Sequence, residues 1–319
     1  PVGLALKPVA MIVQKYGGTS VADPERMRNV ARHIAATKAQ GNQLVIVVSA
    51  MGKATDNLLD LARQVSSAPA GREMDMLLTT GERISMSLLC MALQDLGVEA
   101  MSFTGSQVGI ITDTVHGRAK ILEIKGDRVR EAIGEGKVAV VAGFQGVSTA
   151  KEITTLGRGG SDTTAVALAA ALKADVCEIY TDVTGVFTAD PRIVPQARKL
   201  KHLEFDEMLE MAGAGSKVLA LRSVEFARNH NVPIHVRSSF TWEQGTWVTS
   251  EERKGEKNME EPIISGVVHD ASDAKITVLG VPDQPGVSAA LFEPLANANV
   301  NVDMIVQNTS TAGTTDISF

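Results

Sequence analysis

The segment TTLGRGGSDTTAVALAAAL, residues 154–172, places three glycines around one arginine: Gly157, Gly159, Gly160 and Arg158. The glycines permit positive φ and close backbone approach, and Ser161 or Asp162 can cap the helix that follows. The first N–H groups and the dipole of such a helix favour negative charge. Because the arginine fork suits a carboxylate or phosphate, the segment predicts an anion-binding turn. A capped turn without a ligand is the alternative.

A second glycine turn opens the chain, where the apolar run Met11 to Lys15 is followed by Gly17 and Gly18 in KYGGTS. The run predicts a strand that ends at Lys15. Ligands of open α/β sheets collect at the carboxyl edge of the strands, so this lysine is placed to reach a phosphate. Neither GxxxxGK[ST] nor GxGxxG after a strand occurs, which argues against a P-loop NTPase and a Rossmann dehydrogenase.

Apolar runs alternate with helical patterns along residues 11–249. Strands are expected at 11–15, 44–49, 138–144 and 176–181, with helices from Pro24, up to about Leu96 and at 162–172. This alternation predicts an α/β domain with a mainly parallel sheet and helices on both faces.

Composition limits the classes of partner. The chain has 319 residues, 31 Lys and Arg against 37 Asp and Glu, a net charge of −6 and no long basic run, so nucleic acid and anionic membranes are not expected to bind. No signal peptide or membrane span is expected, since no stretch approaches 18 consecutive apolar residues. Cys90 and Cys177 lie in apolar contexts, which favours buried free thiols and a reducing cytoplasm. No histidine has metal-ligand spacing, so no protein metal site is expected.

The residues after position 249 change in character. SEERKGEKNMEEP, residues 250–262, is charged and poor in apolar residues, and is expected to be an interdomain linker. Beyond it, a strand at 276–281, a helix and a strand at 302–308 form a βαβ pattern. Residues 263–319 resemble the start of an ACT domain, a small amino-acid-binding regulatory module.

Four motifs together resemble the aspartokinase branch of the amino acid kinase family: KYGGTS, TTLGRGGSDTTA, YTDVTGVFTADPR at 180–192 and GSKVL at 215–219. They occur in the family's order between about Met11 and Arg237. The resemblance implies ATP-dependent phosphorylation of the L-aspartate side-chain carboxylate to 4-phospho-L-aspartate, with Mg²⁺. This is the entry step to lysine, threonine and methionine. The alternatives are a sister kinase acting on glutamate or acetylglutamate, and an inert amino-acid-sensing protein.

The resemblance also implies roles for individual residues. Lys15, Asp162 and Lys217 are the implied catalytic residues, with the aspartate orienting both ammonium groups around the transferred phosphoryl. Implied to contact the amino acid substrate are Ser49, Thr55, Glu82, Arg158, Gly159, Gly160 and Ser161. Implied to contact ATP are Lys15, Tyr16, Gly17, Gly18, Thr181, Asp182, Phe187, Asp190, Arg192, Lys217 and Val218. From sequence alone, Glu82 could equally be a first-turn glutamate and Lys217 a solvated lysine at a helix start.

Regulation and assembly are implied by the C-terminal segment. It is too short for the paired ACT domains of similar aspartokinases, so we expect the chain to be part of a longer protein that lysine or threonine inhibits, with this form lacking the complete effector site. Met259 resembles the internal start of a separate regulatory subunit. A homo-oligomer or an α2β2 assembly through ACT domains is therefore expected.

Overall fold

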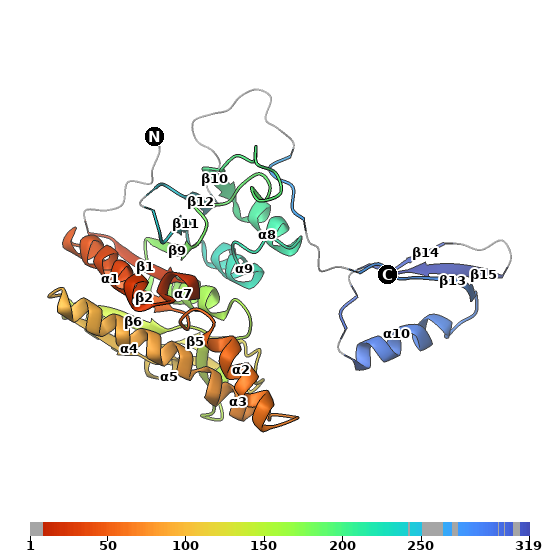
Figure 1. The fold of residues 1–319 in the computed structure, drawn as a ribbon, viewed down its shortest axis with the longest axis horizontal. Helices are drawn as coiled ribbons and strands as arrows, with labels where there is room; N and C mark the ends of the chain where they lie inside the picture. Colours follow the sequence, from red (N-terminus) through yellow and green to blue (C-terminus); the bar gives the residue numbers. More distant parts are fainter. Residues whose placement is uncertain are drawn as a thin grey trace. The chain divides into compact units, whose positions relative to one another are not determined.

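The computed structural model describes residues 9–241, 243–250, 264–269, 274–298, 300–302, 304–308 and 313–319. The chain divides into two compact units, residues 1–269 and 270–319, which we describe separately (Figure 1). Most of the expected linker at 250–262, including Met259, lies outside the described residues. At the end of the first unit, the Val267 N–H donates to the Thr188 carbonyl over 2.8 Å.

An eight-stranded sheet forms the centre of the larger unit. Its order is β10-β12-β11-β9-β1-β2-β6-β3, and every neighbouring pair is parallel except β11 with β12. The strands are β1 (Met11–Tyr16), β2 (Gln43–Val48), β3 (Ala100–Phe103), β6 (Val138–Ala142), β9 (Val176–Thr181), β10 (His202–Glu204), β11 (Ile234–Ser238) and β12 (Thr246–Thr249). The expected α/β class with a mainly parallel sheet is confirmed.

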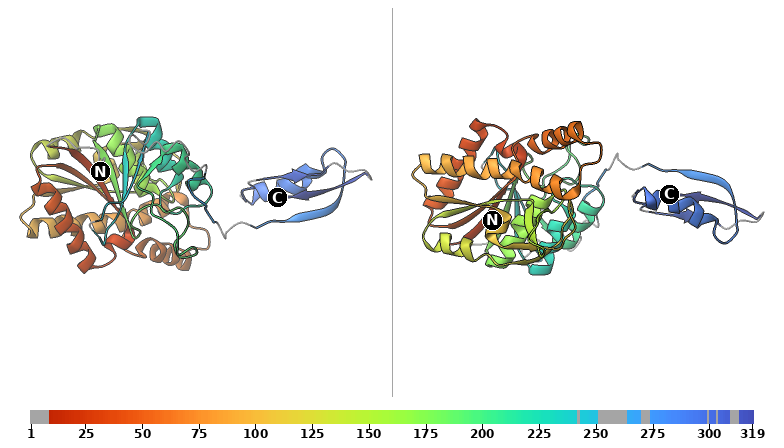
Figure 2. Two further views of the ribbon diagram at one scale, coloured as in Figure 1. Left: turned by 90° about the horizontal axis from the view of Figure 1, so that it is seen from above. Right: turned by 90° about the horizontal axis from the view of Figure 1, so that it is seen from below.

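Helices cover both faces of this sheet (Figure 2). One face packs on α1 (Pro24–Ala39) and α4 (Thr80–Asp95). The other packs on α6 (Asp127–Gly134), α7 (Gly160–Leu172), α8 (Phe205–Gly213) and α9 (Leu221–His230). The central strands are apolar at nearly every position because side chains on both faces are buried. The remaining helical elements of this unit are η1 (Gly18–Val21), α2 (Ala54–Val65), α3 (Gly71–Leu78) and α5 (Gly105–Val108).

A second, four-stranded sheet was not predicted. It consists of β4 (Ile110–Thr112), β5 (Ile121–Ile124), β7 (Gln145–Ser148) and β8 (Ile153–Thr155) in the order β5-β4-β7-β8. Its strands have only three or four residues, too few for a clear alternation pattern. Pairing between segments distant in the sequence therefore determines this sheet.

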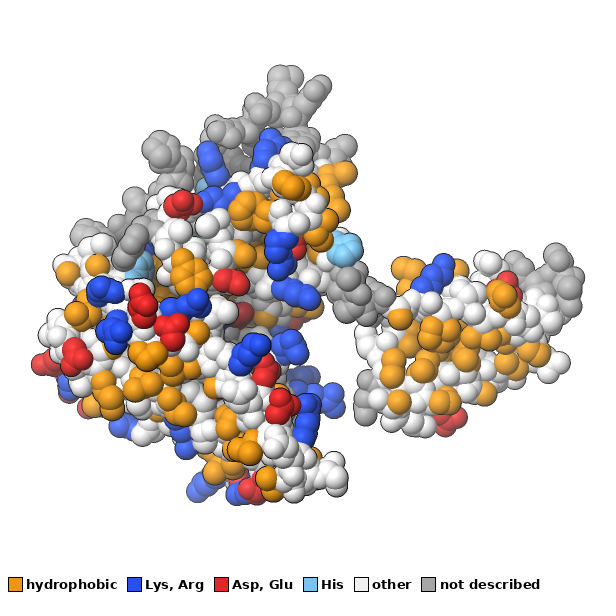
Figure 3. Space-filling model, viewed as in Figure 1, with side chains coloured by type: hydrophobic (Ala, Val, Ile, Leu, Met, Phe, Trp, Pro, Cys, Tyr) orange, Lys and Arg blue, Asp and Glu red, His pale blue; other side chains and the backbone are white. Residues whose placement is uncertain are grey.

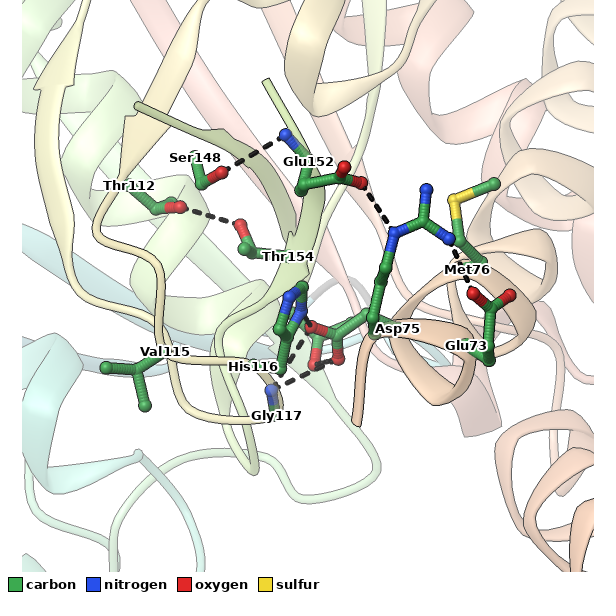
Figure 4. Close-up of polar contacts among 12 residues, drawn as sticks. Glu73, Asp75, Met76, Thr112, Val115, His116, Gly117, Ser148, Glu152 and Thr154 are labelled. Atoms are coloured by element: carbon green, nitrogen blue, oxygen red, sulfur yellow. Dashed lines mark hydrogen bonds and ion pairs between the residues drawn. The ribbon is translucent and has the colours of Figure 1, made fainter. Parts of the chain in front are cut away.

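Buried Asp75 on α3 forms hydrogen bonds that connect this helix to the second sheet. Its carboxylate is 1% exposed and lies 2.7 Å from His116 Nδ1, and it accepts from the Thr155 hydroxyl over 2.6 Å and from the Gly117 N–H. Figure 4 shows His116 and Gly117 directed at this carboxylate. Nearby, Arg72 bridges Glu73 and Glu152 at the surface. These contacts fix the position of α3, which leads directly into α4.

Replacing Asp75 with asparagine is expected to lower the free energy of unfolding by about 2 kcal/mol, because one of its acceptor oxygens becomes an amide group facing hydrogen-bond donors. Chemical denaturation measures the change. Asp127→Asn is the matched control, since that side chain is 84% exposed. Equal stability of the two variants would show that the Asp75 contacts contribute little.

One helical stretch passes a length and composition test for crossing a membrane. Among the described residues this is Gly71–Asp95, with a mean hydropathy of 1.2 over its best window, half of which is buried inside the unit. The stretch comprises α3 and α4, and it carries the buried acidic residues Asp75 and Glu82. Because α4 packs on the central sheet, we assign this stretch to the core of the domain.

The C-terminal unit contains β13 (Thr277–Pro282), α10 (Val287–Asn297), β14 (Val306–Gln307) and β15 (Thr314–Ser318). Strand β15 lies between β13 and β14 and pairs antiparallel with both. The Phe292 ring from α10 packs edge-on against Phe319, with 5.1 Å between centroids. The first strand and the helix match the sequence prediction. Strand β15 was not predicted, and the described part of the expected second strand is shorter than 302–308.

Candidate active site

Three loops meet at the carboxyl ends of β1, β2 and β9. The Gly17 N–H donates to the Tyr180 carbonyl over 3.2 Å, and the Gly52 N–H donates to the Gly18 carbonyl over 3.0 Å. A β-carbon at Gly18 would lie 2.8 Å from the Ala50 carbonyl oxygen, so only glycine allows this approach. The KYGGTS turn therefore lies at the strand edge where ligands of α/β sheets collect.

Lys15 and Asp162 form an ion pair at this edge. The Lys15 Nζ lies 2.6 Å from the Asp162 Oδ1, and the two side chains are 11% and 13% exposed. Lys15 comes from β1 and Asp162 from the first turn of α7. The structure thus brings together two of the three residues expected to be catalytic, although they are distant in the sequence.

The glycine turn before α7 is tightly packed. Gly159 has a φ of +72°, and a β-carbon there would lie 2.4 Å from the Ala220 side chain. A β-carbon at Gly160 would lie 2.9 Å from Leu156 Cβ. Arg158 is exposed, and within the described part of the chain it forms no salt bridge. Its guanidinium is thus available to an anion.

The predicted helix cap was wrong. Gly159 is the N-cap of α7 and makes no side-chain cap bond. Ser161 and Asp162 fall inside the first turn instead, and Ser161 is 8% exposed. The left-handed conformation of Gly159 starts the helix earlier than a serine or aspartate cap would. Asp162 still benefits from the positive end of the helix dipole.

Glu82 lies in the first turn of α4 and is only 3% exposed. Its Oε1 accepts a hydrogen bond from the Ala50 N–H over 3.1 Å, which places the carboxyl group at the loop after β2. Its Oε2 is buried and has no hydrogen-bond partner among the described residues. Burial raises the pKa of Glu82 to about 7, despite the bond from Ala50. A buried carboxylate oxygen without a partner is suited to receive a cationic group.

This burial predicts a pH-dependent effect on stability. The pKa of about 7 in the folded chain lies above the ordinary value of 4.5, so the folded state binds more protons between these values and loses stability as pH rises. Relative to wild type without substrate, Glu82→Gln is expected to gain up to about 3 kcal/mol between pH 4.5 and pH 8. Urea unfolding across this range measures the difference. A constant difference would show that Glu82 has an ordinary pKa.

Two further residues expected to bind substrate lie near the same loop. Ser49 directly follows β2, and its N–H donates to the Tyr16 carbonyl over 3.1 Å. Thr55 lies in the first turn of α2. Both residues are half-buried.

The residues expected to bind nucleotide are more dispersed. Thr181 ends β9, and its hydroxyl donates to Asp182 over 3.1 Å. Asp190 and Arg192 form a 2.7 Å ion pair in the following loop, and hydrogen bonds from Arg192 lower the pKa of Asp190 to about 2. Phe187 precedes this pair and forms a β-bridge with Lys199.

Lys217 lies in the loop between α8 and α9 rather than at a helix start. Its side chain is exposed, whereas Val218 packs against the core. In the described residues it makes no salt bridge with Asp162, so the structure does not join it directly to the Lys15 pair. Figure 3 shows Lys and Arg side chains spread over this face of the larger unit, with Asp and Glu side chains among them.

A buried polar network between β1, β9 and β11 was missed by sequence reasoning. Glu178 accepts from Gln14 over 2.8 Å, from Tyr180 over 3.0 Å and from Arg237 over 3.1 Å. Burial alone would raise the pKa of Glu178, but His235, Arg237 and Gln14 together lower it to about 2. The available signal was a polar residue inside each of two apolar strands, MIVQKY and VCEIYT. This network fixes the strands that carry Lys15 and Thr181.

Comparisons with known proteins agree with this geometry. The model of the amino acid kinase family matches residues 10–238, and that of the ACT domain matches residues 275–319. The aspartokinase of Mycolicibacterium smegmatis is 61% identical over 317 residues, which are 98% of this chain and 74% of that protein. The aspartokinase of Corynebacterium glutamicum is 58% identical over 314 residues, with the same two shares.

Solved structures show the same relationship. The aspartate kinase from Synechocystis is 50% identical with a TM-score of 0.70, and the match covers 97% of this chain and 52% of that one. Aspartokinase III of E. coli, in complex with aspartate and ADP, is 26% identical with a TM-score of 0.75 and corresponding shares of 97% and 78%. The fold is thus that of an amino acid kinase domain, followed by an ACT domain. Within the amino acid kinase family, the chain belongs to the aspartokinases.

Proposed function

We propose that the chain transfers the γ-phosphoryl group of ATP to the side-chain carboxylate of L-aspartate, giving 4-phospho-L-aspartate and ADP. The observation that carries this proposal is the Lys15–Asp162 ion pair, at 2.6 Å, between two glycine turns. The aspartokinase relatives and the complex of the E. coli enzyme with aspartate and ADP support it. The product is the entry compound for lysine, threonine and methionine synthesis.

The chemistry requires little covalent help from the protein. The aspartate side chain is ionised near neutral pH, so no general base is needed. One carboxylate oxygen forms a bond to the γ-phosphorus while the bond from that phosphorus to the β,γ-bridging oxygen breaks, and ADP leaves with the electron pair. Lys15 and Lys217 neutralise charge on the phosphoryl oxygens. Asp162 holds the Lys15 ammonium in place.

Two protein side chains of opposite charge recognise the ammonium and the carboxylate that the α-carbon of aspartate carries. Glu82 receives the α-ammonium on its unpartnered Oε2, and Arg158 binds the α-carboxylate. The remaining proposed substrate contacts are Ser49, Thr55, Gly159, Gly160 and Ser161. Those to ATP are Lys15, Tyr16, Gly17, Gly18, Thr181, Asp182, Phe187, Asp190, Arg192, Lys217 and Val218.

Mg²⁺ is proposed to accompany the nucleotide. This ion usually keeps several waters and binds through substrate phosphates rather than in a cage of protein ligands. The Lys15 ammonium at the strand edge suits the phosphates of such a complex. The cation would lower the charge of the phosphates that the lysines contact.

A coupled assay of ADP release tests the reaction. With ATP and Mg²⁺, we expect turnover with L-aspartate, and rates with L-glutamate and N-acetyl-L-glutamate at least about tenfold lower, because an extra methylene displaces the reacting carboxylate from the phosphoryl. Preference for glutamate or acetylglutamate would identify a sister kinase. Absence of turnover with all three would favour a sensing protein.

The ACT domain is proposed to confer regulation by lysine, threonine or both, and to mediate a homo-oligomeric or α2β2 assembly. A structure of E. coli aspartokinase III in complex with lysine and aspartate supports this role. An effector shifts the enzyme only through unequal affinity for two states.

The buried free thiols of Cys90 and Cys177, as predicted, are consistent with the proposed cytoplasmic location.

Kinase activity is measured while lysine and threonine are added, singly and together. We expect these amino acids to inhibit a protein with complete ACT domains and to leave residues 1–319 active. Sedimentation under the same conditions reports the assembly. Equal inhibition of the two lengths would place the whole effector site within residues 1–319.

A further inference from the structure

A cavity lies on the face of the central sheet opposite to the Lys15 side chain. Side chains alternate across a strand, so Lys15 points to α7 while the next residue, Tyr16, packs with α1 on the other face. The cavity has a volume of ≈ 420 Å³, within the range of small-molecule sites. Its lining includes Ser20, Arg26, Arg32, Ser239, Phe240 and Thr241.

The lining is cationic. Among the described residues that line the cavity there are two arginines and no carboxylate. Arg26 donates to the Thr19 carbonyl over 2.7 Å and lies 3.3 Å from Asp23, with its guanidinium 5.2 Å from the centre of the Phe240 ring. Arg32 contacts only the neutral Asn29 among the described residues. The cavity therefore presents positive charge beside an exposed aromatic ring.

The lining also contains a histidine, His33, which is neutral at physiological pH. Burial lowers its pKa to about 4, and its Nε2 lies 2.7 Å from the Tyr180 hydroxyl. The nearest buried carboxylate, Glu178, already accepts hydrogen bonds from Tyr180 and Gln14. Asp23 forms an ion pair with Arg26, so Arg32 is the lining arginine that has no acidic partner among the described residues.

Two buried hydroxyls in the lining have no hydrogen-bond partner among the described residues. They are Ser20 Oγ, in a residue that is 1% exposed, and Thr241 Oγ1. Buried polar atoms in folded proteins nearly always have a partner. Unpartnered hydroxyls that line a cationic cavity are suited to the oxygens of a bound anion.

We propose that this cavity binds a small organic anion. Its carboxylate or phosphate contacts Arg26, Arg32 and the two unpartnered hydroxyls, and its apolar part packs on Phe240. The Lys15–Asp162 ion pair lies on the opposite face of the sheet, so the bound anion does not contact it, and the cavity shares one lining residue, Tyr16, with the proposed ATP contacts.

Calorimetric titration of the 319-residue chain tests this site with phenyl phosphate, benzoate and neutral benzyl alcohol, which share one ring. Saturating ADP and aspartate keep the kinase site filled. At least one anion is expected to bind with a Kd about tenfold below that of benzyl alcohol, and the stronger anion identifies the ligand chemistry. Arg32→Gln is expected to raise this Kd about tenfold, and Ser20→Ala about threefold.

Arg63→Gln is the matched control, since Arg63 is a 70% exposed arginine with a neighbouring acidic partner on α2, and it should leave the Kd unchanged. Melting curves establish that each variant is folded. Equal affinity for benzyl alcohol, no saturable binding of either anion, or an unchanged Kd in both Arg32→Gln and Arg26→Gln would overturn the proposal. The ADP-release assay without these compounds tests the kinase reaction independently.

Discussion

Lys15→Ala is expected to lower kcat by about 10²-fold to 10³-fold, the effect of removing one preorganised electrostatic donor from a transition state. The Lys15 ammonium is held 2.6 Å from Asp162 and is only 11% exposed, so bulk water cannot readily replace it. Lys217→Ala should lower kcat by at least about 10²-fold. Steady-state ADP release at saturating ATP and aspartate measures both.

The control for these variants is Lys125→Ala, because Lys125 is exposed and lies between β5 and α6. It should retain wild-type kcat. Asp162→Asn tests the charge of this partner, since the amide oxygen can still accept a hydrogen bond from Lys15 but carries no negative charge, and an intermediate loss of kcat is expected. A near-normal kcat for folded Lys15→Ala would contradict the proposed role of Lys15 in phosphoryl transfer.

Glu82→Gln is expected to raise the KM for aspartate by about tenfold to a hundredfold while changing the KM for ATP by less than about threefold. The reason is that a charge-assisted contact with the substrate ammonium is lost, whereas the nucleotide is bound elsewhere. Varying each substrate at saturating concentrations of the other measures the two constants. Exposed Glu123→Gln on β5 serves as the control.

The pH dependence supplies an independent test of Glu82. Its pKa of about 7 without substrate means that lowering the pH from 8 to 6 protonates the carboxyl group and weakens its attraction for the ammonium. The wild-type KM for aspartate should rise over this interval, and that of Glu82→Gln should stay nearly constant. A selective rise in the KM for ATP would instead place Glu82 at the nucleotide.

The tertiary structure determined features that no local pattern reports. The second sheet is built from strands of three or four residues, and β15 completes the C-terminal sheet, so their existence depends on pairing partners far along the chain. The cap of α7 was assigned to Ser161 or Asp162 because those types commonly cap helices, but Gly159, which is left-handed and packed against Ala220, is the cap, two or three residues earlier. Local propensity is weak where long-range contacts compete with it.

The sequence by itself determined the central strands, the family and the chemical types at the site, because buried parallel strands and glycine turns leave strong local patterns. The resemblance implied that Asp162 orients Lys15 and Lys217, and the structure shows the ion pair with Lys15. Only the tertiary structure decided that Glu82 is buried with one oxygen that has no partner among the described residues, and that Lys217 lies in a loop away from Asp162. Burial, charge pairing and pKa depend on neighbours brought from distant segments. These quantities arise only when the sheet assembles and removes each side chain from water.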